Sequence, residues 1–216
     1  MLSDTRFSTP LYTAALAASH LGLSPSTLNR WLNKDALLTA VSGPSPRAPR
    51  LPFIGLVEAQ FYRELRRAGL SMQAITSGMK VVRRELGVRM LVKGVIAHDG
   101  KDLLMNLAER GDPEWERARD RQLGLRGIID IGLKPIVWGD DGLPIRLRLT
   151  AYGDTPVVAD PAYAFGQPIV ETSGARVEDI LSMFKAGEKL VTVASEMGVT
   201  SEDVESIVRT HLTLAA

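Results

Sequence analysis

The sequence predicts an α+β fold that is mainly helical and opens with a helix-turn-helix. Most segments repeat apolar residues at helical spacing, the alternating pattern of a β-strand is confined to the middle of the chain, and glycine, proline and hydroxyl residues stand where helix caps are expected. We therefore expect a helix-turn-helix with a proline-rich linker (1–50), a basic helical pair (51–93), a small antiparallel β region (94–158) and a three-helix unit (159–216).

Composition excludes several classes of protein. The 216 residues are 45% apolar and 24% charged, which is ordinary for a globular chain. Cysteine is absent, and this excludes disulfides, thiol nucleophiles and cysteine-based zinc sites. No apolar run approaches the ~20 residues that span a bilayer, and the first residues lack the pattern of a secretory signal. We expect a cytoplasmic protein that does not contact membranes.

The small formal net charge of +1 hides two halves of opposite sign. Residues 1–93 carry 13 Lys and Arg against 5 Asp and Glu, whereas residues 94–216 carry 13 against 20. A basic half attracts a polyanion and an acidic half repels one. Charge alone therefore favours the N-terminal half as the site of any nucleic-acid contact.

Two short helices joined by a tight turn are predicted over residues 12–32. Thr13 is placed to cap the first helix, and Gly22 closes it. Ser24 is placed to cap the second, with Pro25 at its first position, where the missing N–H costs nothing. This arrangement is a helix-turn-helix.

The second of these helices has one apolar and one polar face. Leu28, Trp31 and Leu32 recur at helical spacing, so they should face the first helix. The remaining side chains are hydroxyls, amides and cations, which are the groups that reach phosphates and base edges in a major groove. The alternative is a helical hairpin whose polar face is merely solvated. The predicted DNA contacts are Ser24, Ser26, Thr27, Asn29, Arg30, Asn33 and Lys34.

This stretch resembles the MerR-like winged helix-turn-helix. The match rests on Tyr12, Thr13, Ala18, Leu21, Gly22, Ser24, Thr27, Leu28, Arg30 and Trp31. Where that family has a wing hairpin, this chain has the proline-rich residues 41–52, and prolines oppose strand pairing. We expect a linker here, with Arg47 and Arg50 following the DNA backbone.

The next segment predicts two amphipathic helices, one ending at Gly69 and one running from Ser71 to Gly87. Ile54, Val57, Phe61 and Leu65 form the apolar stripe of the first. Basic residues are expected on the outer faces, where they either contact phosphates or form a solvated surface. The candidate phosphate contacts are Arg63, Arg66 and Arg67.

Two hairpins are predicted in the β region. The first pairs residues 95–97 with 103–107, and the second pairs 136–138 with 143–149. A charged stretch, 112–122, separates them. In the last strand, alternation places Leu143, Ile145, Leu147 and Leu149 on one face and Arg146 and Arg148 on the other.

No catalytic or metal-binding pattern is present. Asp140 and Asp141 are neighbours on a turn and point apart. His20, His98 and His211 have no ligand spacing, and no nucleotide-binding or nucleophile motif occurs. The sequence therefore predicts no catalytic residues, no metal site, no cofactor and no enzyme.

The last segment predicts three helices, the third capped by Thr200 with Asp203 three residues on. The second and third have helix-turn-helix spacing, but Glu202, Asp203 and Glu205 face outward and would repel phosphates. We expect either a protein-contacting unit or a structural cap.

A second resemblance concerns this segment. It is similar to the family of unknown-function domains numbered 433, and the match rests on Asp160, Pro161, Phe165, Gly166, Pro168, Arg176, Val177, Asp179, Ile180, Ala186, Gly187, Glu188, Ala194 and Val199. The middle of the chain, FIGLVEAQFYRELRRAGLSMQAI with the later HDGKDLL, is similar to VapB-like antitoxins that place a MerR-like head before such a domain.

This resemblance implies a DNA-binding antitoxin that represses its own operon and neutralises a ribonuclease toxin of the PIN-domain type. An alternative is a stand-alone MerR-like regulator with an effector-binding or dimerising C-terminal half. A third is an enzyme or an accessory factor of DNA processing. The expected partners are double-stranded operator DNA, a toxin and a second copy of the chain, because such DNA readers usually bind as two-fold dimers.

Overall fold

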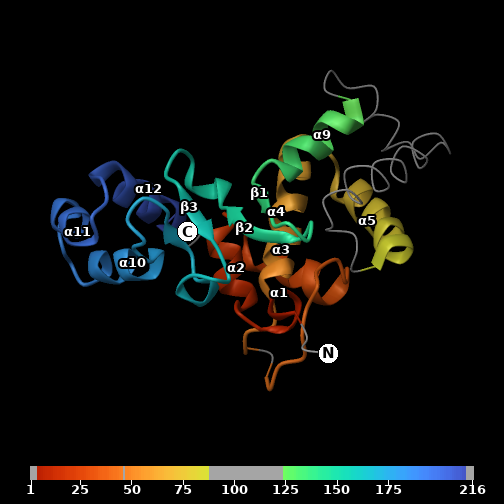
Figure 1. The fold of residues 1–216 in the computed structure, drawn as a ribbon, viewed down its shortest axis with the longest axis horizontal. Helices are drawn as coiled ribbons and strands as arrows, with labels where there is room; N and C mark the ends of the chain where they lie inside the picture. Colours follow the sequence, from red (N-terminus) through yellow and green to blue (C-terminus); the bar gives the residue numbers. More distant parts are fainter. Residues whose placement is uncertain (1–3, 46, 88–123, 213–216) are drawn as a thin grey trace. The chain divides into compact units, whose positions relative to one another are not determined.

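The computed structural model describes residues 4–45, 47–87 and 124–212. It confirms an α+β fold that is mainly helical (Figure 1). The chain forms two compact units: unit 1 combines residues 1–56 with 146–216, and unit 2 comprises residues 57–145. The first predicted hairpin (95–107) and the charged stretch 112–122 lie outside the described residues.

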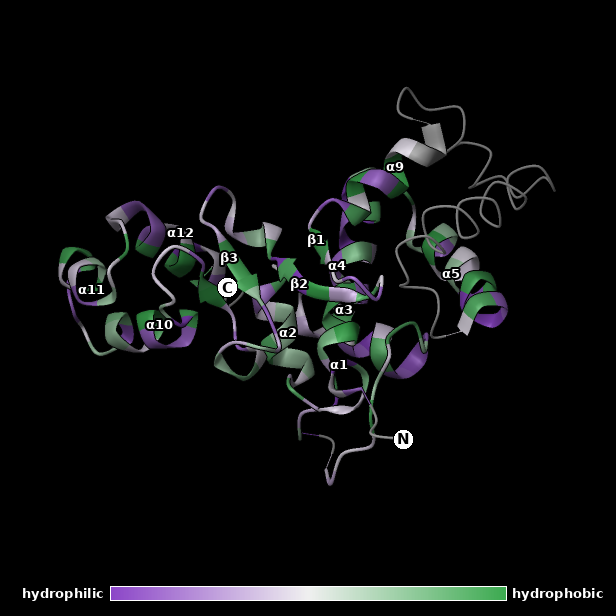
Figure 2. Ribbon diagram, viewed as in Figure 1, coloured by the Kyte–Doolittle hydropathy of each residue, from purple (hydrophilic) through white to green (hydrophobic). Residues whose placement is uncertain are grey.

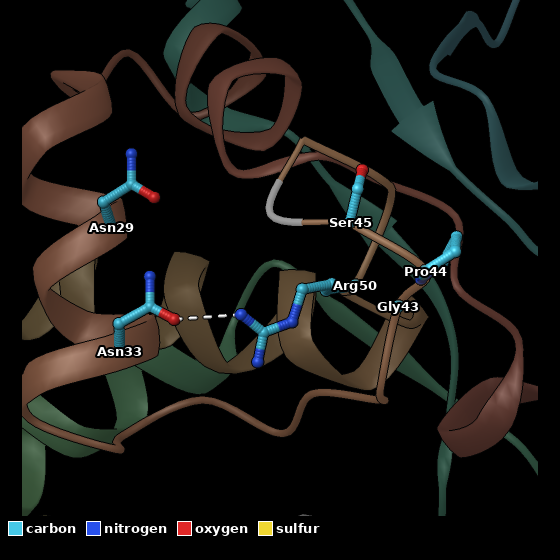
Figure 3. A pocket seen from close by; sticks show the side chains of 6 residues that line it. All are labelled: Asn29, Asn33, Gly43, Pro44, Ser45 and Arg50. Atoms are coloured by element: carbon cyan, nitrogen blue, oxygen red, sulfur yellow. Dashed lines mark hydrogen bonds between the residues drawn. The ribbon is translucent and has the colours of Figure 1, made fainter.

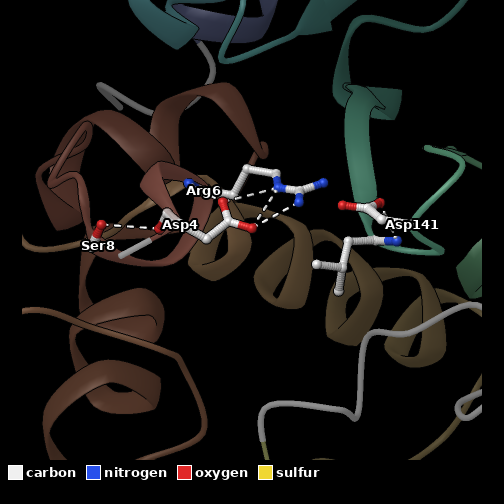
Figure 4. Close-up of polar contacts among 5 residues, drawn as sticks. Asp4, Arg6, Ser8 and Asp141 are labelled. Atoms are coloured by element: carbon white, nitrogen blue, oxygen red, sulfur yellow. Dashed lines mark hydrogen bonds and ion pairs between the residues drawn. The ribbon is translucent and has the colours of Figure 1, made fainter. Parts of the chain in front are cut away.

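Unit 1 begins with the helix-turn-helix, and both predicted caps are confirmed. The Thr13 hydroxyl accepts a hydrogen bond from the Leu16 N–H at 3.1 Å, and the Ser24 hydroxyl accepts one from the Thr27 N–H at 3.2 Å. Asp4 caps the short helix before them and pairs with Arg6 (Figure 4). The elements are α1 (Thr5–Ser8), α2 (Ala14–His20), α3 (Pro25–Asn29) and the π-helical turn η1 (Arg30–Lys34).

A small sheet has the strand order β1-β2-β3-β4, and β1 is among the residues of unit 2. β2 pairs antiparallel with β3, and β3 with β4. The alternation predicted for β2 holds for Leu147 and Leu149, which are buried, but is wrong for Ile145, which is 41% exposed. The bounds are β1 (Ile136–Trp138), β2 (Pro144–Arg148), β3 (Val157–Ala159) and β4 (Ile169–Val170), with short 3-10 turns η4 (Thr150–Tyr152) and η5 (Ala164–Gly166).

Three helices complete unit 1, as predicted. They are α10 (Val177–Lys185), α11 (Leu190–Met197) and α12 (Ser201–Leu212). The predicted cap of α12 is confirmed and is reciprocal, because the Thr200 hydroxyl accepts from the Asp203 N–H and the Asp203 carboxylate accepts from the Thr200 N–H. No helix in the described part of the chain is long and apolar enough to cross a bilayer.

A hydrogen-bonded triad of the buried His20 and Tyr152 and the half-buried His211 joins the helix-turn-helix to the C-terminal helices. The Tyr152 hydroxyl lies 2.7 Å from Nδ1 of His20 in α2 and 2.9 Å from Nε2 of His211 in α12. A hydroxyl can donate to one imidazole nitrogen and accept from the other, so both contacts are satisfied together. The Tyr12 hydroxyl also donates to the Gly166 carbonyl. The first and last predicted segments are therefore parts of one compact unit.

The triad makes stability depend on pH. Burial lowers the pKa of His20 to about 3 and that of His211 to about 4. In the unfolded chain both rings titrate near 6.5, so between these values the unfolded state binds more protons and acid destabilises the fold. We expect unfolding to cost about 2 kcal/mol less at pH 5 than at pH 7 from His20 alone.

Urea unfolding at the two pH values measures this difference. His20→Gln removes the titrating ring while keeping a hydrogen-bonding side chain, and it should shrink the difference. Equal stability of the unchanged protein at pH 7 and pH 5 would contradict the assignment.

Unit 2 contains most of α4 (Phe53–Arg67) with α5 (Met72–Leu86) and α9 (Gly124–Leu133). The α5 helix is amphipathic as predicted, mixing hydrophilic and hydrophobic residues along its length (Figure 2). The single apolar stripe predicted for α4 is wrong, because residues 53–62 are all buried, Glu58 and Gln60 included. Glu58 accepts from Arg83 of α5 at 2.7 Å. A Cβ added to Gly132 of α9 would lie 2.6 Å from the Phe61 ring, so α9 packs closely on α4.

Candidate nucleic-acid interface

The second helix of the helix-turn-helix changes geometry halfway along. After Asn29 the chain continues as η1, where the Asp35 N–H donates to the Arg30 carbonyl at 2.9 Å, five residues back. Leu28, Trp31 and Leu32 are buried beneath this helix, which confirms the predicted inward face. Single π-helical turns are rare and are frequent at functional sites. We call α3 and η1 together the recognition helix.

The predicted contact residues of the recognition helix lie together on its outer side. All are exposed except Thr27, which is half-buried, and no acidic side chain is among them. Their contact with DNA stays a prediction. The exposed members are Ser24, Ser26, Asn29, Arg30, Asn33 and Lys34.

Hydroxyl groups cluster at the start of this helix. The Ser24 oxygen caps the first turn and lies 3.0 Å from the Ser26 oxygen and 2.8 Å from that of Thr27. The helix N-terminus also carries partial positive charge from its unpaired N–H groups. The first turn therefore offers hydroxyl and N–H donors to a phosphate, while the Ser24 oxygen also accepts the capping hydrogen bond.

A single carboxylate orients the arginine of the recognition helix. Nε of Arg30 donates to the largely buried Asp35 at 3.2 Å, while the Arg30 side chain stays 63% exposed. Because Nε makes this bond, the terminal Nη atoms hold the other four N–H donors of the guanidinium. Two parallel donors are what the acceptor edge of guanine or a phosphate requires.

The proline-rich segment is a closed loop rather than the predicted linker. The Val41 N–H donates to the Arg50 carbonyl at 2.9 Å, and Leu51 bridges antiparallel to Tyr12. Leu51 is fully buried. The two ends of the segment thus bond to each other, and its C-terminal end bonds to Tyr12 at the start of the helix-turn-helix, with the loop beside the recognition helix. Sequence reasoning missed this because no strand pattern marks it.

A groove of about 560 Å³ separates this loop from the recognition helix (Figure 3). One guanidinium reaches across it, because Nη1 of Arg50 donates to Oδ1 of Asn33 at 3.0 Å. The Arg50 side chain is therefore directed to the recognition helix, and its contact with the DNA backbone stays a prediction. Arg47 is exposed on the same loop. The groove is lined by Asn29, Asn33, Gly43, Pro44, Ser45 and Arg50.

The candidate phosphate contacts of α4 differ in exposure. Arg66 and Arg67 are exposed, as predicted. The outward position predicted for Arg63 is wrong, because its side chain is only 13% exposed and pairs with the buried Glu64 at 2.6 Å. Burial lowers the pKa of the Arg63 guanidinium, and Glu64 opposes that effect. Arg63 is committed to the interior of unit 2.

Among the described residues, no three His, Asp or Glu side chains are placed to hold a metal ion. Asp141 accepts from the Leu143 N–H and shapes the turn between β1 and β2 (Figure 4). The exposed donors of the recognition helix, with the groove beside it, make this helix and its loop the candidate site.

Comparison with known proteins supports this assignment. A family model described as "Putative DNA-binding HTH domain" matches residues 10–79, and one described as "Protein of unknown function (DUF433)" matches residues 157–209. The chain is 32% identical over 223 residues to "Putative antitoxin VapB45" of Mycobacterium tuberculosis, covering 93% of each protein.

A solved structure agrees with the fold. The crystal structure of Rv2018 from Mycobacterium tuberculosis is similar, with a TM-score of 0.75, 33% identity, and coverage of 94% of this chain and 99% of that one. Similarity of this degree over nearly the whole length shows that the chain belongs to the VapB-like antitoxin family, with a DNA-binding helix-turn-helix followed by a DUF433 domain.

Proposed function

We propose that this protein is a non-enzymatic antitoxin that represses its own operon and neutralises a ribonuclease toxin of the PIN-domain type. One observation carries the DNA-binding half of the proposal. The recognition helix exposes hydroxyls, amides and cations free of carboxylates, above a buried Leu28, Trp31 and Leu32 that fix its orientation. Such a face suits the major groove.

The DNA-binding surface and the C-terminal surface of the proposal differ in charge. In the proposal, the recognition helix with Arg47 contacts DNA, and Arg66 and Arg67 add phosphate contacts. The C-terminal domain (157–212) exposes Glu202 and Glu205 at the start of α12, so it suits a protein rather than DNA. The name of the VapB45 relative supports a toxin as that protein.

A second copy of the chain is part of the proposal. Two-fold dimers read two half-sites about one helical turn apart, so a palindromic operator is expected. Sedimentation should show a dimer on DNA. A monomer both free and on DNA would remove this part of the proposal.

One experiment tests both halves. The full chain is co-expressed with the product of the neighbouring gene, co-purification is measured, and a gel shift is run on the upstream DNA. Co-purification with loss of ribonuclease activity, together with a shift, supports the proposal. A shift without any captured ribonuclease favours a stand-alone MerR-like regulator instead.

Arg30→Ala tests the recognition helix directly. Losing a bidentate donor to a base should weaken operator binding by about 1–3 kcal/mol, or ~5- to 150-fold, and relax the preference at one base pair. Arg176→Ala is the matched control, because Arg176 is an exposed arginine that pairs with Asp179 in the acidic C-terminal domain. Unchanged binding by Arg30→Ala would remove that residue from the interface.

A further inference from the structure

We propose that Arg50 is a positioning residue that fixes the amide of Asn33, so that the recognition helix presents N–H donors and selects guanine over adenine at one position. This inference rests on the proposed DNA binding and adds which base the recognition helix prefers at one position. It gives Arg50 a role other than phosphate contact.

The orientation of the amide follows from hydrogen-bond chemistry. A guanidinium only donates, so the Asn33 atom that faces Nη1 of Arg50 at 3.0 Å must be the carbonyl oxygen. The amide nitrogen of Asn33 then points away from Arg50, on the side of the groove where Asn29 lies (Figure 3). Without Arg50 the amide would be free to rotate, since Asn33 is exposed.

Hydrogen bonds hold the backbone of Arg50 through both its N–H and its carbonyl. Its backbone N–H donates to the Tyr12 carbonyl at 3.0 Å, and its carbonyl accepts from the Val41 N–H at 2.9 Å. Its Nε lies 3.5 Å from the Val41 carbonyl. A Cβ on Gly43 would lie 3.0 Å from Cγ of Arg50, so the loop packs against the arginine stem. A side chain anchored in this way holds Asn33 in place before DNA arrives.

The fixed amide changes which base fits. Asparagine reads adenine by accepting from N6 and donating to N7, which requires both ends of the amide. Here a cation occupies the accepting end, and the N6 amino group of adenine would meet another donor. Guanine instead offers two acceptors, O6 and N7, to the two N–H groups of the Asn33 amide. The pair therefore favours guanine.

The test is selection of bound duplexes from a randomised pool, followed by affinity measurement on single-base variants. The unchanged protein should prefer guanine over adenine at one position by ~10-fold or more. Arg50→Met should remove that preference. Arg50→Lys, which keeps a donor to Oδ1, should restore it in part. Asn33→Asp keeps the acceptor for Arg50 but loses the donors, and it should also remove the preference.

A double substitution separates positioning from direct contact. If Arg50 acts through Asn33, then Arg50→Met added to Asn33→Ala should cause no further change in base preference. Arg47→Met is the control, because Arg47 is an exposed arginine of the same loop and its loss should weaken all duplexes alike. Circular dichroism melting verifies that each variant folds.

Three results overturn the inference. One is an unchanged base preference in Arg50→Met with equal weakening on every duplex and a smaller salt dependence, which marks a phosphate contact. Another is a preference for adenine in the unchanged protein. The third, failure of the folded protein to bind any duplex, overturns the proposed DNA binding as well, and so is distinguishable from the first two.

Discussion

Tyr152→Ala is expected to lower the free energy of unfolding by about 3–5 kcal/mol. Tyr152 is 1% exposed, so the substitution leaves a cavity where an aromatic ring packed. It also removes the hydroxyl that lies between His20 and His211, leaving the buried His20 without that partner. Because domains are stable by only ~5–15 kcal/mol, a drop of this size is a large fraction of the total. Urea denaturation followed by circular dichroism measures it.

Two further variants show how much of this loss of stability comes from the Tyr152 hydroxyl and how much from burial of the ring. Tyr152→Phe keeps the ring and should cost about 1–3 kcal/mol, the share of the hydroxyl. Tyr163→Ala is the control, because Tyr163 is 58% exposed and its loss should change stability little. If Tyr152→Phe has the same free energy of unfolding as the unchanged protein, then the hydrogen bonds of the triad contribute no net stability.

Arg83→Met should destabilise unit 2 by about 3 kcal/mol or more. Its guanidinium donates to Glu58, whose side chain is 3% exposed. The Arg83 side chain is 30% exposed, and its removal takes from the buried Glu58 carboxylate an attraction that offsets the desolvation cost of that charge. The measurement is again the urea midpoint, read with the denaturation slope to check cooperative unfolding.

The neighbouring residue provides a matched control for this prediction. Arg84 is 73% exposed and pairs with the half-exposed Glu85, so Arg84→Met should change stability by less than about 0.5 kcal/mol. Equal effects at the two positions would show that the pair between Arg83 and Glu58 does not carry the stability assigned to it.

Features set by neighbouring residues were predictable from the sequence. The caps at Thr13, Ser24 and Thr200 each depend on a side chain meeting an N–H three residues away. The inward face of the recognition helix follows from helical periodicity. Its π-helical turn was not predicted, because no local residue pattern marks where the hydrogen-bond spacing lengthens.

Features set by distant contacts were not predictable. The pair of Arg50 with Asn33 spans a proline-rich loop that, read alone, predicts a linker. The burial of residues 53–62 of α4 on every side, and of most of the Arg63 side chain, depends on what packs around the helix, which periodicity within one helix does not reveal. His20, Tyr152 and His211 carry no motif, and folding alone brings them together.

The buried triad limits how this chain can be divided or recombined. Two family matches, one at each end, suggest modules that could be exchanged between homologues, yet Tyr152 and His211 lie outside both matches, and Tyr152 hydrogen-bonds with His211 and with His20 of the first. A hybrid that takes its DNA-binding end from one homologue and its C-terminal end from another would have to inherit a compatible tyrosine and both imidazoles. We therefore expect the DNA-binding end and the C-terminal end to be inherited together, with differences between homologues arising from substitutions on their exposed faces rather than from exchange of domains.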